Sequence, residues 1–147
     1  MTSITHAAMG LGIGALFPKA PIGWAVAFSL LPDLDHLLFV RSLRLRVGGM
    51  RHARTFLHEL LGGVLYLGLG GALELWRPPL GALLITCVSA HLLCDFLNGY
   101  SRPFVGIRSA PSVDLGVRLW VRVVQEVVVG GVFLWIFFTK FVLGGSN

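Results

Sequence analysis

Charge is scarce in this chain. Only 13% of its 147 residues are charged, and seven of those are acidic. An ordinary soluble domain carries about 25% charged residues, so this low fraction argues against a protein that is surrounded by water on all sides. An apolar fraction of 55% and a mean hydropathy of +0.79 point the same way. Together these values indicate an integral membrane protein.

Cysteine is also rare, with two residues in the whole chain. Cys87 and Cys94 are seven positions apart on one predicted helix, a rise of about 10 Å, which is too long for a disulfide. The sequence therefore excludes a disulfide framework and does not indicate an oxidising compartment. We also expect no secretory leader, because the first residues lack a basic start and Lys19 interrupts the apolar run that follows.

Glycine, by contrast, is abundant, with 19 residues. Residues 10–14 and 68–72 place small residues four apart, a spacing that lets helix backbones approach closely in lipid. Loose or curved helices are an equally good interpretation of the same glycines.

The first apolar stretch is too short in each half to cross a bilayer. It covers residues 7–31 and is broken at residues 18–21, between two prolines. Each half is about 18 Å of helix, against a hydrocarbon core of about 30 Å. The break predicts a re-entrant helical hairpin. One kinked span is the alternative, and it would put His6 and Asp33 on opposite sides of the membrane.

Longer apolar segments follow at residues 55–76, 79–98 and about 123–143. The expected fold class is therefore all-α: an integral membrane helical bundle with an N-terminal re-entrant hairpin and about three transmembrane helices. Residues 1–147 are expected to form a single domain. A monotopic or partly buried bundle is the alternative, because each segment is short between charges.

The arginines predict the orientation. Five lie in residues 41–54 and four in residues 99–122, but the turn between the intervening spans carries Arg77 alone. The positive-inside rule makes the two basic connections cytoplasmic. We therefore expect a protein of the inner (cytoplasmic) membrane, in contact with membrane lipid. Because topology explains the net charge of +5, no nucleic acid partner is expected.

All five histidines and three of the four aspartates lie in short clusters beside the apolar segments. Imidazoles and carboxylates form hydrolytic metal sites, and such groups are costly beside hydrocarbon. The expected topology brings the clusters to one depth on the cytoplasmic side, and His6 joins them if the hairpin folds back. The candidate metal ligands are His6, Asp33, Asp35, His36, His52, His58, His91 and Asp95.

The spacing within two clusters suits a shared cation. His91 and Asp95 are four residues apart and share one helix face, although a structural hydrogen bond is an equally common use of such a pair. Residues 33–36 hold two carboxylates and an imidazole, which a cation would neutralise. The simpler interpretation of residues 33–36 is a solvated turn after a helix.

Three further charged residues lie near the same predicted surface. Arg51 and Arg54 can bind the phosphate of a substrate, or they can hold lipid headgroups. Glu126 begins the last apolar segment, where it is either a further ligand or general base, or an interfacial solvated group.

The order of these motifs resembles the YdjM-type family, whose members are described as LexA-binding, inner-membrane-associated, predicted metal-dependent hydrolases. The resemblance covers roughly the first hundred residues. It rests on Thr5-His6, Pro-Asp-Leu-Asp-His at residues 32–36, a basic His-x-Arg stretch leading to Phe-Leu-His58, and His91-x-x-x-Asp95. Many members read His-Arg-x-x-Thr-His-Ser in the third block, whereas here Glu59 takes the serine position.

More distantly, the histidines and aspartates are similar in order to those of zinc-dependent phospholipase C and its single-strand nuclease relatives. That similarity implies ligands at His6, one of Asp33 and Asp35, His58, and the pair His91 and Asp95. The second histidine-rich half of the phospholipase site has no counterpart after Asp95, so one or two ions are expected. Zinc is the leading candidate, with manganese and iron also suited to these ligands.

The sequence and this resemblance predict a metal-dependent hydrolase of a phosphoester substrate, which includes phospholipids. Asp35 and Glu59 are the candidate catalytic carboxylates. The first alternative is a non-catalytic metal-binding membrane protein that docks a soluble regulatory partner on its arginine-rich surface. The second is a small transporter, but that would place ionisable groups at mid-membrane depth, whereas here they gather at one surface.

Overall fold

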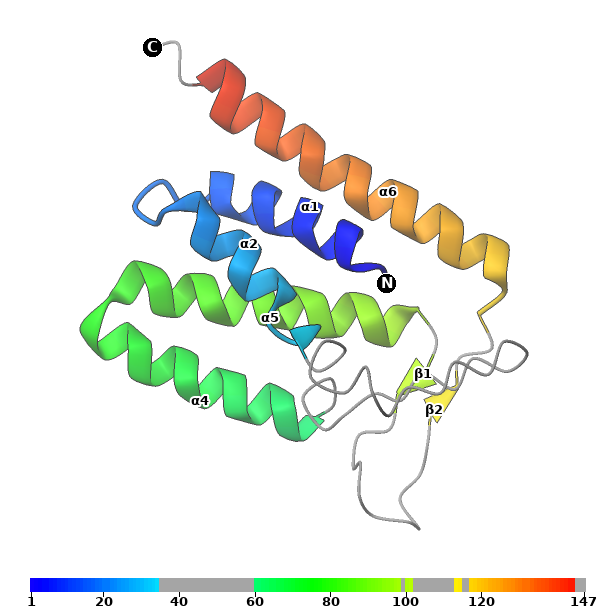
Figure 1. Ribbon diagram of the computed structural model, residues 1–147, viewed down its shortest axis with the longest axis horizontal. Helices are drawn as coiled ribbons and strands as arrows, with labels where there is room; N and C mark the ends of the chain where they lie inside the picture. The colour runs from blue at the N-terminus through cyan, green and yellow to red at the C-terminus, as the bar shows by residue number, and fades with distance from the viewer. Residues whose placement is uncertain (35–59, 99, 102–112, 115–116, 145–147) are drawn as a thin grey trace.

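The computed structural model describes residues 1–34, 60–98, 100–101, 113–114 and 117–144 (Figure 1). Apart from two antiparallel two-residue strands, β1 (Tyr100–Ser101) and β2 (Val113–Asp114), the described elements are helices. These helices are α1 (Ser3–Ala15), α2 (Ile22–Leu30), α4 (Leu60–Trp76), α5 (Pro78–Leu97), α6 (Leu119–Phe137) and the π-helix η2 (Phe138–Leu143), which continues α6. The prediction of an all-α fold is confirmed.

The first two helices form an antiparallel pair joined by a turn at residues 16–21 (Figure 1). Thr2 is the N-cap of α1, and its Oγ1 accepts a hydrogen bond from the backbone N–H of Thr5 at 3.4 Å. Pro21 holds an extended backbone immediately before α2. Because the chain reverses at this turn, the beginning of α1 and the end of α2 lie side by side, as expected of a hairpin and not of one kinked span.

A second antiparallel pair consists of α4 and α5, which meet at Arg77 (Figure 1). The two prolines that open α5 occupy its first turn, where a missing backbone N–H costs no helical hydrogen bond. Helix α4 ends at Trp76, as predicted from the sequence. The predicted start of this segment, at residue 55, lies outside the described residues. Helix α5 packs against α2 and α1, and Met9, Leu83 and Cys87 are fully buried in the core of the bundle.

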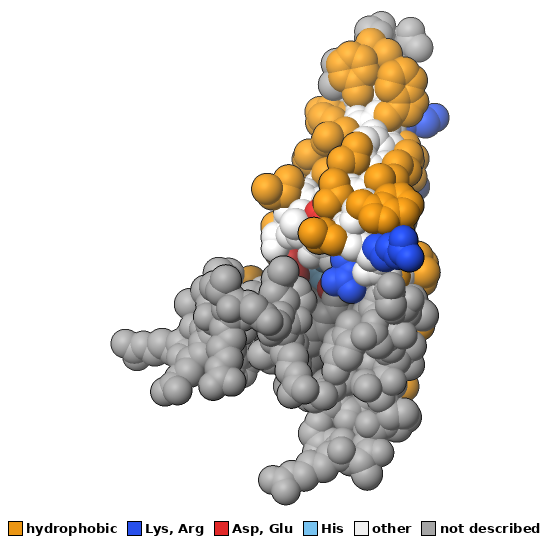
Figure 2. Space-filling model, turned by 90° about the vertical axis from the view of Figure 1, so that its right-hand side faces the viewer, with side chains coloured by type: hydrophobic (Ala, Val, Ile, Leu, Met, Phe, Trp, Pro, Cys, Tyr) orange, Lys and Arg blue, Asp and Glu red, His pale blue; other side chains and the backbone are white. Residues whose placement is uncertain are grey.

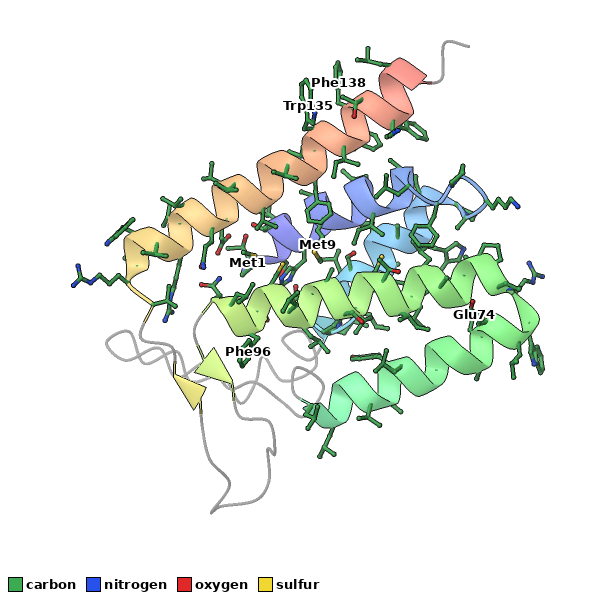
Figure 3. All side chains as sticks on the ribbon, turned by 180° about the vertical axis from the view of Figure 1, so that it is seen from behind. Met1, Met9, Glu74, Phe96, Trp135 and Phe138 are labelled. Carbon is green, nitrogen blue, oxygen red and sulfur yellow. The ribbon has the colours of Figure 1, made fainter. Side chains whose placement is uncertain are left out.

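Helix α6 packs along α1 but has no buried residue of its own. Trp135 and Phe138 project from its outer side, away from the other helices (Figure 3). Hydrophobic side chains cover most of this helix, and basic side chains lie where it begins (Figure 2). Two stretches, Pro78–Leu97 and Leu119–Phe141, are long and apolar enough to cross a membrane, whereas α4 is apolar but shorter in its described part.

Helix α1 fits between its neighbours because it carries glycine where they come closest. A Cβ atom on Gly10 would lie 2.7 Å from the Cα of Val26 in α2, and one on Gly12 would lie 2.5 Å from the carbonyl oxygen of Phe133 in α6. Close packing at residues 10–14 is therefore confirmed. In residues 68–72 the outcome depends on the position: a Cβ on Gly70 would lie 2.4 Å from Cγ1 of Ile85 in α5, whereas one on Gly68 would meet nothing within 4 Å.

The glycine contacts lead to a paired prediction. Gly12→Ala forces a methyl group into the α1–α6 contact, and overpacking of this kind costs about 1–3 kcal/mol. Gly68→Ala adds the same methyl group to open space on α4, where the higher helix propensity of alanine stabilises by up to about 1 kcal/mol. Unfolding of both variants in detergent should show a loss of stability for Gly12→Ala alone. Equal behaviour of the two variants would contradict the described packing.

Candidate metal centre

Four of the eight candidate ligands come together at one end of the helical bundle. His6 lies on α1, Asp33 follows α2 by three residues, and His91 and Asp95 occupy the last two turns of α5. This is the end where α1 begins and α5 ends (Figure 1). In Figure 3 the labelled Met1 lies at this end, and Glu74, beside the α4–α5 turn, lies at the other.

The four side chains lie close together, and three of them, His6, Asp33 and His91, form a group that could hold a metal ion. The Nδ1 atom of His6 lies 3.2 Å from Oδ2 of Asp33, and its Nε2 atom lies 3.5 Å from Oδ1 of Asp95. The Nε2 atom of His91 lies 3.7 Å from Oδ1 of Asp33 and 3.8 Å from Oδ2 of Asp95. One ligand atom each from His6, Asp33 and His91 lies within 4.8 Å of the others. Each imidazole thus lies between the same two carboxylates.

This cluster is buried. Both histidines are 0% exposed, Asp95 is 4% exposed and Asp33 is 9% exposed. The two imidazole rings are in contact, with their centroids 3.6 Å apart and their planes tilted by 36°. Two carboxylates removed from water require a positive charge nearby, but two adjacent imidazolium rings would repel each other. The Met1 amino group beside Asp95 supplies one positive charge, and a cation bound among these side chains would balance the second carboxylate without two imidazolium rings.

The orientation of His91 is fixed by the backbone at the end of α2. Its Nδ1 atom lies 2.6 Å from the carbonyl oxygen of Ser29, so Nδ1 carries the hydrogen and donates it. That carbonyl has no helical partner because the backbone N–H of Asp33 bonds to Leu30 instead, at 3.0 Å, which tightens the last turn. The lone pair of the neutral ring is therefore on Nε2, which faces Asp33 and Asp95.

The same reasoning fixes the hydrogen on His6. An ionised carboxylate only accepts hydrogen bonds, so the contact with Asp33 requires that Nδ1 of His6 donates. In the neutral ring the lone pair is then on Nε2, a buried atom without a hydrogen-bond partner in the described part of the chain. This lone pair faces a carboxylate oxygen of Asp95 at 3.5 Å, an arrangement that is repulsive unless a proton on Nε2 or a metal ion lies between the two atoms. Burial opposes protonation of His6, but the contacts with Asp33 and Asp95 outweigh it and raise the pKa of His6, so the proton and a metal ion compete for this position.

The spacing of these atoms fits a small divalent ion. Donors around a tetrahedral zinc ion, with bonds of about 2.0–2.1 Å, lie about 3.3–3.4 Å apart. The three separations that involve an Nε2 atom are 3.5, 3.7 and 3.8 Å, which is about 0.1–0.5 Å longer than the donor separations around zinc. In the structure as it stands, the amino group of Met1 also contacts Oδ1 of Asp95.

The partners of Glu126 in the structure lie in the first turn of α1. Its Oε2 atom accepts hydrogen bonds from the hydroxyl groups of Thr2, at 2.7 Å, and Thr5, at 3.0 Å. Glu126 thus binds α6 to the first turn of α1, where a negative charge also complements the helix dipole. The pattern Thr2-x-x-Thr5 marks the start of α1, but its partner on α6 is 121 residues away from Thr5 and has no local signal.

The other predicted site residues lie outside the described residues, and their roles stay predictions. They are the candidate ligands and catalytic carboxylates Asp35, His36, His52, His58 and Glu59, and the candidate phosphate-binding residues Arg51 and Arg54.

Comparison with known proteins agrees with this description. Residues 1–142 match the family model described as YdjM inner membrane protein, so the resemblance expected from the sequence is confirmed. No curated protein and no solved structure matches the chain.

The geometry predicts that metal content depends on His91 and not on remote acidic residues. His91→Ala removes one of the two Nε2 donors, so the purified variant should lose its bound metal, whereas Glu74→Gln, at the opposite end of the bundle, should keep it. Elemental analysis of the wild type and both variants measures this. Full metal occupancy in His91→Ala would rule out the described centre.

Proposed function

The chain belongs to the YdjM inner membrane protein family, and on this basis we propose that it is a metal-dependent hydrolase that cleaves a phosphoester at the cytoplasmic surface of the membrane. The observation that carries the proposal is the buried group of His6, Asp33 and His91, whose ligand atoms lie within 4.8 Å of one another, with Asp95 beside both imidazoles. The donor set also fits the proposal, because nitrogen and carboxylate oxygen are ligands of hydrolytic zinc sites, and manganese and iron accept the same ligands.

The proposed chemistry divides between the ion and the protein. A divalent ion in this site supplies a Lewis acid that activates water and stabilises negative charge on the phosphoryl oxygens. The carbonyl of Ser29 and the carboxylate of Asp33 hold the two imidazoles with their Nε2 atoms inward. Arg51 and Arg54 bind the phosphate, and Asp35 and Glu59 serve as the catalytic carboxylates, in keeping with the sequence motifs.

We further propose that the bundle is a single multi-pass domain of the inner membrane. Helix α5 and the stretch Leu119–Phe141 cross the bilayer, and α4 crosses together with residues that precede it. Helices α1 and α2 have 13 and nine residues, about 20 Å and 14 Å in length, so the hairpin enters the bilayer and returns. The distribution of arginines along the sequence supports a cytoplasmic position for the metal centre.

The orientation is testable with one cysteine at each end of the bundle. In a background without Cys87 and Cys94, Arg77→Cys should react with a membrane-impermeant maleimide applied to intact spheroplasts. Arg118→Cys, at the start of α6, should react only after the membrane is permeabilised. The opposite pattern would place the metal centre on the outer face.

The hydrolase proposal is tested with purified, metal-loaded protein. The wild type should release phosphate or alcohol from a panel of phosphomonoesters, phosphodiesters and phospholipid vesicles. Asp95→Asn should lower kcat by at least about a hundredfold, because neutralising a ligand weakens the charge balance at the reacting centre. Turnover is followed by phosphorus NMR, with Glu74→Gln as the control. A wild type that keeps stoichiometric metal but turns over no member of the panel would instead support the regulatory, non-catalytic alternative.

A further inference from the structure

Glu126 joins the outermost helix of the bundle to the start of α1. Helix α6 packs along α1 without a buried residue of its own. A single oxygen of Glu126, Oε2, accepts both hydroxyl hydrogens, from Thr2 at 2.7 Å and from Thr5 at 3.0 Å. The two hydroxyl oxygens also lie 3.1 Å from each other. Glu126 therefore holds the two threonines in one arrangement.

Both threonines act on the backbone of His6. The backbone N–H of His6 donates to the carbonyl oxygen of Thr2 at 3.1 Å, which is the first helical hydrogen bond of α1. Thr5 precedes His6 in the chain and is buried, and its own backbone N–H donates to the hydroxyl oxygen of Thr2 at 3.4 Å. A displacement of either threonine therefore moves the backbone from which the His6 side chain projects.

The His6 imidazole has little freedom to compensate for such a displacement. The side chain is 0% exposed, and it contacts carboxylates on two other segments, Asp33 through Nδ1 at 3.2 Å and Asp95 through Nε2 at 3.5 Å. A metal–ligand distance tolerates only about 0.2 Å of error, whereas the first turn of a helix frays unless it is held. The hold that Glu126 has on this turn thus bears directly on whether Nε2 reaches an ion.

We propose that Glu126 is a positioning residue of the metal centre, which holds His6 in place through Thr2 and Thr5 and does not bind the ion itself. The inference rests on the metal centre of the proposed function and adds α6 to the elements that the centre requires. Both hydroxyl groups donate to the same oxygen of Glu126, so one acceptor oxygen at this position is sufficient. The role therefore depends on hydrogen bonding and not on the carboxylate charge.

Titration of the metal-free protein with cobalt(II) tests this role without turnover, because the visible absorption of the bound ion reports its ligands. Glu126→Leu should bind cobalt(II) about tenfold more weakly than the wild type, at the lower end of the usual effect of residues that support a metal ligand. The bound ion should also absorb less intensely, as water replaces a histidine. Glu126→Gln should recover most of the affinity and the wild-type spectrum, because the amide oxygen accepts two hydrogen bonds.

Two further variants test the route from Glu126 to His6. Thr5→Val keeps the shape of the side chain but removes one donor, so it should weaken cobalt(II) binding by a smaller factor than Glu126→Leu. In the Thr5→Val background, Glu126→Leu should cost less than it does in the wild type, because both substitutions break the same contact. Gln125→Met is the matched control on α6, since Oε1 of Gln125 is buried without a partner in the described part of the chain. This variant should keep the wild-type affinity and spectrum.

Each contrary outcome has a distinct meaning. Wild-type affinity and spectrum in Glu126→Leu would overturn the positioning role and leave the metal centre standing. An equal loss in Glu126→Gln would also overturn it, because the ion would then depend on the carboxylate itself. An equal loss in Gln125→Met would do the same, because it would reflect general damage to α6. A wild type that binds no cobalt(II) would remove the metal centre, and the proposed function and this inference with it.

Discussion

The contact between two tilted imidazole rings, with centroids 3.6 Å apart between two carboxylates, is the constraint that the other features of the bundle satisfy. Four ionisable side chains in a buried space are unfavourable unless their charges balance and their hydrogens point the right way. Each ring donates through Nδ1 to a fixed acceptor, a carboxylate for His6 and a carbonyl for His91. Both Nε2 atoms therefore face the interior of the cluster, where one cation can bind them.

The arrangement of the helices sets the position of this cluster along the bundle. The chain reverses after α1 and again after α4, and each reversal contains prolines that end or begin a helix. Two reversals bring the start of α1, the end of α2 and the end of α5 to one level. Gly10 and Gly12 then let α1 lie close against α2 and α6, so that His6 stays near the carboxylates. The packing of α1 at Gly10 and Gly12 thus helps to set the position of His6 in the metal centre.

Much of this arrangement is predictable from the sequence, because its causes are local. Prolines mark the helix breaks, long apolar stretches mark the helices, and a four-residue spacing places His91 and Asp95 on one helical face. The contacts between elements are less accessible. The partners of Glu126 lie more than a hundred residues away in sequence. The different surroundings of Gly12 and Gly68 also depend on which helices become neighbours, and composition alone does not decide that.

The hydrogen bond from His91 to Ser29 involves a main-chain oxygen, and this has a consequence for how the family is compared. The acceptor exists because α2 ends where it does, and it does not depend on the hydroxyl group of Ser29. Any small residue that fits beside Gly10 can stand at position 29 and still present the same oxygen. A comparison of the residues found at position 29 among relatives would therefore not reveal this hydrogen bond. An insertion or deletion near Pro32, by contrast, would move the carbonyl oxygen and turn the imidazole of His91 away.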